Sequence, residues 1–233
     1  MTTAQDVAQE HLLRFQRVAS EARGADAALS ASSFTLGTGS RASLVGPPGA
    51  GSLALDLIAA VAPPPHGRIV LFGADAGDIP RSGRCAFRRR LGLMLQALCL
   101  VDELSVFDNL ALAAQAIGRS REDYGPKAVE LLTWVGLGRR MSQDAGSLDL
   151  EGLRRVSLAR ALMNGPDLLL IDDPVKALPP PASRAVLKLI DEAHGAGIAV
   201  LMTVDGDGAA GADGSIIRLA SIASPLASTA SVA

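Results

Sequence analysis

Cysteine, histidine and aromatic residues are scarce in this chain of 233 residues. Two cysteines and three histidines are too few for a disulfide framework or a clustered zinc site. Aromatic side chains make up only 3% of the chain, with one tyrosine and one tryptophan, so the stacking platforms that hold single-stranded nucleic acids are hard to build. The composition therefore argues against secreted disulfide domains, zinc proteins and single-strand binders.

Strong charge of either sign and long apolar runs are also missing. The net charge is −2 and the basic residues are dispersed, apart from Arg88, Arg89 and Arg90, so we expect no nucleic-acid partner. No apolar stretch approaches the roughly 20 residues of a membrane-spanning helix, and the N-terminus does not read as a signal peptide. We expect a reduced, cytoplasmic environment.

Short apolar runs rich in β-formers alternate with helical patterns along most of the chain. The runs at 167–172 and 198–204 are apolar almost throughout, which is typical of parallel strands covered on both faces. The predicted strands are 42–46, 68–73, 91–96, 167–172, 198–204 and 215–220, and the predicted helices are 53–62, 126–137, 151–163 and 183–194. This alternation predicts an α/β fold with a mainly parallel sheet flanked by helices, and with extra helices between Gln96 and Gly165.

Residues 46–53 read GPPGAGSL and join a predicted strand to a predicted helix. Gly46, Gly49 and Gly51 have the spacing of a phosphate-binding loop, in which backbone N–H groups and a helix N-terminus hold the anion. Such a loop also carries a lysine for the β- and γ-phosphates and a hydroxyl for Mg²⁺. Here those two places hold Ser52 and Leu53. Taken alone, the hexapeptide GPPGAG reads best as a tight turn between a strand and a helix.

Further motifs follow in a fixed order and change that interpretation. After the loop come GRIVLFG, RRRLGLMLQALCLVDELSVFDNLAL, VELLTWVGLG, LRRVSLARALMNGPDLLLIDDP and GIAVLMTV. In this order the chain resembles the ATP-binding subunit of an ABC transporter from about Ser33 to His194, and more weakly to Ala220. The stretches LGLMLQ, SVFDNLAL and LLTWVGLG are most similar to the FtsE cell-division ATPases, ahead of lipoprotein-releasing and amino-acid-import relatives.

The resemblance implies a P-loop NTPase-type fold at residues 31–220, with an inserted helical subdomain at about 97–165. Residues 1–30 are then an N-terminal extension without an assigned role, and residues 221–233 are expected to be a disordered tail. The family uses ATP and Mg²⁺, and two subunits close around two nucleotides. A dimer, formed with a second copy or with another ATPase subunit, is therefore expected.

The resemblance also assigns the site residues. It places Gly46, Gly49, Gly51, Ser52, Leu53 and Asp172 in the ATP site, with Gln96 as the loop glutamine and Asp173 in the place of the catalytic glutamate. Mg²⁺ is expected only if ATP binds, through Asp172 and Gln96, and no other metal site is expected. The signature LSGGE aligns with LDLEG at 148–152, so that Asp149 stands for the serine and Leu150 and Glu151 stand for two glycines.

Most of these ligand-facing positions depart from the family. Ser52 supplies no cation and Leu53 no Mg²⁺ ligand, while Asp149 and Glu151 add repulsion of a few kcal/mol toward a polyphosphate at an effective dielectric near 20. Three further elements are changed: the adenine-stacking aromatic expected near 20–24 is absent, the D-loop aspartate is Pro179, and the switch histidine is Val204. Asp173 is one methylene shorter than glutamate. We therefore expect impaired ATP binding and hydrolysis on an intact fold.

The resemblance and its departures favour a degenerate FtsE-like subunit that docks on an FtsX-like membrane partner in cell division. Docking is expected through the cleft beside Gln96 and the segment LVDELSVFDN at 100–109, which would hold the chain at the inner face of the cell membrane. Two alternatives stay open. One is a working ATPase in which Arg41 or another cation replaces the lysine, and the other is a silent partner of an intact ATPase in a heterodimer.

Overall fold

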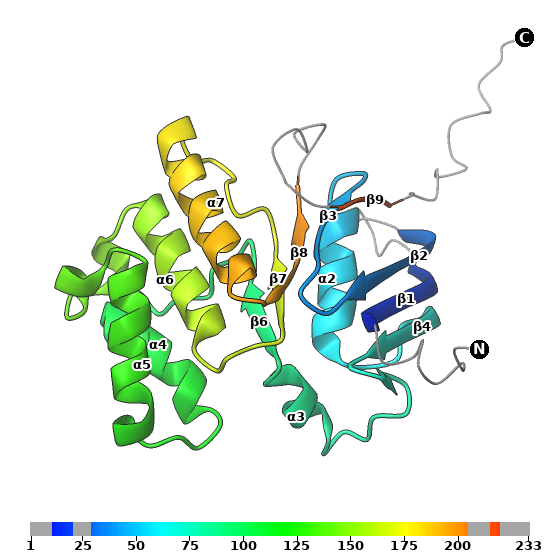
Figure 1. The fold of residues 1–233 in the computed structure, drawn as a ribbon, viewed down its shortest axis with the longest axis horizontal. Coiled ribbons are helices and arrows are strands. Elements are labelled where there is room, and N and C mark those ends of the chain that lie inside the picture. The colour runs from blue at the N-terminus through cyan, green and yellow to red at the C-terminus, as the bar shows by residue number, and fades with distance from the viewer. Residues whose placement is uncertain (1–10, 21–28, 205–214, 220–233) are drawn as a thin grey trace, which may run out of the picture.

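Two sheets and a layer of helices make up the computed structural model, which describes residues 11–20, 29–204 and 215–219 (Figure 1). The first sheet is parallel and has the strand order β6-β7-β8-β3-β9. Its strands are β3 (Arg41–Val45), β6 (Leu91–Met94), β7 (Leu168–Ile171), β8 (Ala199–Thr203) and β9 (Ser215–Arg218). The predicted parallel sheet and its flanking helices are therefore present.

The second sheet is antiparallel, and its strand order is β2-β1-β4-β5. It comprises β1 (His11–Ser20), β2 (Leu29–Gly37), β4 (His66–Leu71) and β5 (Ala74–Asp75). The predicted strand at 68–73 thus lies in this sheet and not in the parallel one. Residues 11–20, to which the sequence assigned no role, form β1, one of its two inner strands, where Phe15 stacks on Phe34 with ring centroids 4.7 Å apart. The expected tail at 221–233 lies outside the described residues.

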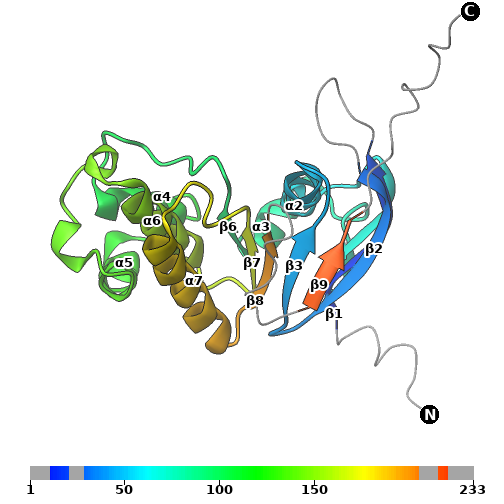
Figure 2. The same cartoon turned by 90° about the horizontal axis from the view of Figure 1, so that it is seen from above.

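Helix α2 (Ala50–Ala60) lies between the two sheets, as Figure 2 shows. Its buried residues Ala54, Leu55 and Ile58 belong to a core cluster that includes side chains from both sheets. Apolar residues at this spacing form one continuous helix face, and this face contributes to the core that the two sheets share. The helix is held with its N-terminus at the end of β3.

Four larger helices cover the face of the parallel sheet opposite α2: α4 (Val106–Gln115), α5 (Arg121–Trp134), α6 (Leu150–Leu162) and α7 (Pro180–Gly195) (Figure 1). Short helical turns occur at α3 (Arg84–Arg88), η1 (Gly138–Arg140) and η2 (Ala145–Ser147). Helices α4, α5 and α6 occur between β6 and β7, where the sequence predicted extra helices. Ser105 caps α4, and Ser120 forms a capping box with Asp123 at the start of α5.

The close approach of α6 to β6 depends on Gly92. A Cβ atom at this residue would lie 2.6 Å from the carbonyl oxygen of Ala161 and 2.6 Å from Cδ2 of Leu169. Only glycine avoids these contacts, so it lets the helical layer lie directly on the sheet. Within the described ranges, no helix combines the length and the apolar character needed to cross a membrane.

Candidate functional site

The GPPGAG turn joins the carboxyl end of β3 to the first residue of α2. Gly49 is the N-cap residue of α2 and has φ of +79°, a left-handed conformation that favours glycine. Gly51 lies in the first turn of the helix, and a Cβ there would stand 2.7 Å from Cγ2 of Thr203 on β8. These two glycines are therefore required by the turn and by the packing of α2 against β8, whatever the loop binds.

The lysine position of the turn is occupied by a side chain that contacts the residue following β7. The Ser52 hydroxyl donates a hydrogen bond to Oδ1 of Asp172, with an oxygen–oxygen distance of 3.0 Å. Leu53, at the Mg²⁺ hydroxyl position, packs against the core cluster that contains α2. Neither residue adds a positive charge to the turn.

A small hollow lies within the turn. Its lining, which we call the loop hollow, consists of Leu44, Gly46, Pro47, Gly49, Gly51, Ser52, Thr203 and Val204. Its volume is about 10 Å³, which is room for about one water molecule. Val204, at the switch-histidine position, donates its backbone N–H to the carbonyl of Leu44 at 3.2 Å. No lining residue carries a cation.

Two buried carboxylates follow β7 beside this hollow. Asp172 and Asp173 are each 7% exposed. Oδ1 of Asp172 accepts a second hydrogen bond, of 2.6 Å, from the Thr203 hydroxyl, and the same hydroxyl accepts one from the backbone N–H of Asp173 at 2.9 Å. Asp173 has φ of +43°, which is uncommon for a residue other than glycine and occurs often at functional sites.

The charge of Asp172 also acts on α2. Burial, followed by repulsion from Asp172, raises the pKa of Asp56, which stands one turn after Ser52. Gln96 is exposed and follows β6 by two residues. The N–H of Asp172 donates to the carbonyl of Met94 at 2.8 Å, so the ends of β6 and β7 are tied together next to Gln96. The structure thus gathers the loop, Asp172 and Asp173 at one end of the parallel sheet.

Residues 148–152, which the sequence aligned with the family signature, lie at the start of α6. The Asp149 carboxylate caps the helix by accepting the N–H of Gly152 at 2.8 Å, and Leu150 is the first helical residue. Glu151 forms an ion pair with Arg155 one turn later. The two carboxylates among these positions, Asp149 and Glu151, therefore have partners within this chain.

A known family model matches the part of the chain that contains most of the elements just described. The family model described as "ABC transporter" matches residues 29–176, which include the GPPGAG turn, Gln96, the start of α6 and the acidic pair. The chain belongs to the ABC transporter family. The match spans more than half of the chain and agrees with the family suggested by the order of its motifs.

Several ABC relatives are similar to a comparable degree. The cell division ATP-binding protein FtsE of Bacillus subtilis is 32% identical over 176 residues, which cover 75% of this chain and 77% of FtsE. A phosphonates import ATP-binding protein, PhnC of Alcaligenes faecalis, is 34% identical over 178 residues, covering 72% and 64% of the two chains. The methionine import ATP-binding protein MetN of Vibrio cholerae is 31% identical over 150 residues, but the match covers only 44% of MetN and 64% of this chain.

Solved ABC cassettes show the same fold at lower identity. A dimeric structure of the ATP-binding cassette MJ0796 bound to ADP and Pi has a TM-score of 0.77 and 23% identity, and the match covers 89% of this chain and 94% of the other. The cbiO1 structure from Clostridium perfringens has a TM-score of 0.76 and 18% identity, with 90% and 87% covered. At these identities the likeness establishes an ABC cassette fold.

Sequence reasoning missed two residues of this ABC site. The Thr203 hydroxyl forms hydrogen bonds with both Asp172 and Asp173. Its position at the end of a predicted strand, next to Val204, could have identified it as a site residue. Arg154 on α6 is 4% exposed, although the pair Arg154–Arg155 reads as a solvated helix face. Burial lowers the pKa of Arg154, while the charges of Asp173 and Asp172 act in the opposite direction. No pattern in the sequence distinguishes the buried arginine from its neighbour.

Proposed function

We propose that this chain is an FtsE-like ABC subunit that docks on an FtsX-like membrane partner without an ATP cycle of its own. The observation that carries the proposal is the Ser52 hydroxyl bound to Asp172 where the family's loop has a lysine. Phosphoryl transfer depends on positioning and on neutralisation of phosphate charge, so the loss of this cation removes a main source of affinity. The loop hollow holds no other cation and is the size of one water molecule.

The residues around the hollow do not fit Mg²⁺-ATP in other respects. Leu53 cannot ligate Mg²⁺, and Oδ1 of Asp172 already accepts hydrogen bonds from Ser52 and Thr203. The described residues contain no group of three or more His, Cys, Asp or Glu side chains that could hold a metal ion. If two copies pair as the family's subunits do, the Asp149 carboxylate of each copy would meet the phosphates of the other and repel them.

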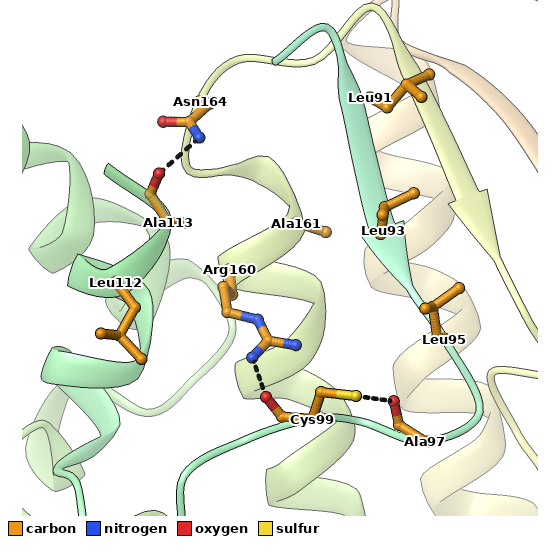
Figure 3. A pocket seen from close by; sticks show the side chains of 10 residues that line it. All are labelled: Leu91, Leu93, Leu95, Ala97, Cys99, Leu112, Ala113, Arg160, Ala161 and Asn164. Carbon is orange, nitrogen blue, oxygen red and sulfur yellow. Dashed lines mark hydrogen bonds between the residues drawn. The ribbon is translucent and has the colours of Figure 1, made fainter. Parts of the chain in front are cut away.

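The docking part of the proposal is supported by a groove near Gln96 (Figure 3). The groove has a volume of about 410 Å³ and lies between β6, α4 and α6, with residues 95–99 along one side. Most of its lining side chains are apolar, including Leu91, Leu93 and Leu112. This size and character suit the apolar face of a short partner helix, bound by packing into a groove.

Polar contacts hold one side of this groove and the segment that follows it. One guanidinium nitrogen of Arg160 donates to the carbonyl of Cys99 at 2.6 Å, and a second donates to the carbonyl of Leu98 (Figure 3 shows the first). Asn109 is fully buried, and its amide donates to the carbonyls of Val101, Leu104 and Ser105. The segment 100–109 is therefore held in one shape, as a preformed docking surface requires.

Two apolar side chains remain exposed near the groove. Leu112 on the groove and Val101 on the neighbouring segment are each 40% exposed. We propose an FtsX-like membrane protein as the occupant, at the inner face of the cell membrane, because the stretches LGLMLQ, SVFDNLAL and LLTWVGLG resemble FtsE. Burial of the groove on that partner would remove these side chains from water.

A pull-down from detergent-solubilised membranes tests the docking. The chain with its natural sequence, without added nucleotide, should capture an FtsX-like membrane protein that mass spectrometry identifies. Leu112→Glu should lower the capture about tenfold, because a buried unpaired carboxylate costs more than the 1.4 kcal/mol that a factor of ten requires. Added Mg²⁺-ATP should not change the yield.

Val129→Glu is the matched control for this substitution. Val129 is 45% exposed on α5 and does not line the groove, so the same added charge should leave the capture unchanged. Equal capture by Leu112→Glu and the natural chain would contradict docking through the groove. Capture that requires Mg²⁺-ATP would contradict a partner complex independent of nucleotide.

A further inference from the structure

A cavity separate from the groove and the loop hollow lies at the carboxyl ends of three helices, α5, α6 and α7. Its volume is about 270 Å³, and we call it the tryptophan cavity after the Trp134 side chain in its lining. Trp134 is the last residue of α5, Leu162 is the last residue of α6, and Ala196 is the C-cap of α7, and all three line the cavity. The carboxyl end of a helix carries a partial negative charge, which favours cations near the last turn.

Apolar side chains form much of the lining. Leu131, Leu162 and Ala193 are buried and face the cavity from the three helices. The indole of Trp134 also lines it, and the indole N–H donates to Oε2 of Glu192 on α7 at 2.8 Å. This hydrogen bond uses the single polar atom of the indole and joins α5 to α7. The cavity therefore has a preformed apolar surface, and its volume is close to the lower end of the range for ligand pockets.

The charged side chains of the lining are mostly negative. Glu130 and Glu192 both line the cavity, and Lys127 is the one cation among the described residues that do so. The Lys127 ammonium pairs with Glu130 at 3.0 Å, but the two side chains are 43% and 67% exposed, so the pair is weak and can be exchanged for another cation. Lys188, which lies outside the lining, approaches Glu192 only to 3.7 Å and is 78% exposed. Two carboxylates and three helix ends therefore face one ammonium group.

We propose that the tryptophan cavity binds a small organic cation that carries an apolar group, such as an aromatic or alkyl ammonium. The apolar group packs against Leu131 and Leu162, and the ammonium group lies beside Trp134 and the carboxylates of Glu130 and Glu192. Among aromatic side chains, tryptophan attracts ammonium groups most strongly. The inference does not rest on the proposed function, because the lining of this cavity shares no residue with the groove or with the loop hollow.

The intrinsic fluorescence of the full chain measures this binding directly, because Trp134 is its only tryptophan. Titration with benzyltrimethylammonium should change the emission saturably, with a dissociation constant on the order of 1 mM. Benzyl alcohol and phenylacetate carry the same ring without a cation, so each should bind at least about tenfold more weakly. At ten times its dissociation constant, benzyltrimethylammonium should also raise the midpoint of thermal unfolding by about 3–5 °C.

Glu192→Gln tests the contribution of the carboxylate. Glutamine keeps an oxygen that can accept the Trp134 N–H, so the substitution removes the charge and preserves the hydrogen bond. The affinity for benzyltrimethylammonium should fall about fivefold to tenfold, whereas the affinity for benzyl alcohol should not change. Glu122→Gln is the matched control, because Glu122 is exposed on α5 and does not line the cavity. This control should bind the cation as the natural chain does.

Three results would overturn the inference. The first is an emission that responds only linearly to benzyltrimethylammonium, as in collisional quenching, together with an unchanged unfolding midpoint. The second is equal affinity for benzyltrimethylammonium and benzyl alcohol, which would exclude selection for a cation. The third is equal affinity of Glu192→Gln and the natural chain for the cation. Binding or absence of binding of Mg²⁺-ATP bears only on the proposed function.

Discussion

Replacing Ser52 by lysine and Leu53 by serine is expected to raise the affinity for Mg²⁺-ATP by about 100-fold. The substitutions restore a cation and a Mg²⁺ hydroxyl at the N-terminus of α2, where the turn that would hold a phosphate is already in place. One charge-assisted hydrogen bond to a phosphate contributes about 1.5–3 kcal/mol, and 2.7 kcal/mol corresponds to a factor of 100. Isothermal titration at fixed salt measures the change.

The control for this variant is Ser52→Met combined with Leu53→Ser. Methionine has nearly the length of lysine but no charge, so it should give at most a tenth of the gain. Equal affinities of the lysine and methionine variants would show that charge at residue 52 does not limit nucleotide binding. ATP turnover should stay low in both variants, because Asp149, Leu150 and Val204 are unchanged.

Replacing Gly51 by alanine is expected to lower the free energy of unfolding by about 2–3 kcal/mol, which corresponds to roughly 5–10 °C in the unfolding midpoint. The added Cβ would lie 2.7 Å from Cγ2 and 3.1 Å from Cβ of Thr203. The threonine cannot rotate away cheaply, because its hydroxyl binds both Asp172 and the N–H of Asp173. Chemical and thermal unfolding of the nucleotide-free chain measure the loss.

Gly195→Ala is a suitable control for the same chemical change. Gly195 is the last residue of α7, and a Cβ there would meet no atom within 4 Å. Alanine in a helix is favoured over glycine by up to about 1 kcal/mol, so this variant should be as stable as the natural chain or more stable. If Gly51→Ala also left stability unchanged, the turn would not be required by the fold, and its glycines would need another explanation.

The parallel sheet could be predicted because several of its strands are continuous apolar runs in the sequence. Strands β7 and β8 are apolar at every position except Thr203, and all nine of their residues are buried, as expected for strands covered on both faces. The antiparallel sheet was harder to predict. In β1, polar Gln16 and Arg17 interrupt the apolar alternation where the pairing with β2 shifts register, so the strand signal at 11–20 is weak.

Site residues could be predicted where a sequence motif identifies them from the residues next to them in the chain. The order of motifs located Ser52, Asp172 and Val204, and the structure brings all three to one end of the parallel sheet. Thr203 and Arg154 could not be assigned in this way, because their surroundings come from segments about 20 to 30 residues apart in the chain. Burial of one arginine and exposure of the next is decided by how α6 packs on the sheet.

Titration of the natural chain with Mg²⁺-ATP tests the account most directly, because the central claim is that the fold is kept while the nucleotide is not bound. Isothermal titration at physiological salt should show no saturable binding up to about 1 mM ATP, a limit that corresponds to about −4 kcal/mol. Saturation in the micromolar range, near −8 kcal/mol, would contradict the account. It would mean that another cation of this chain meets the phosphates in the place where Ser52 now binds Asp172.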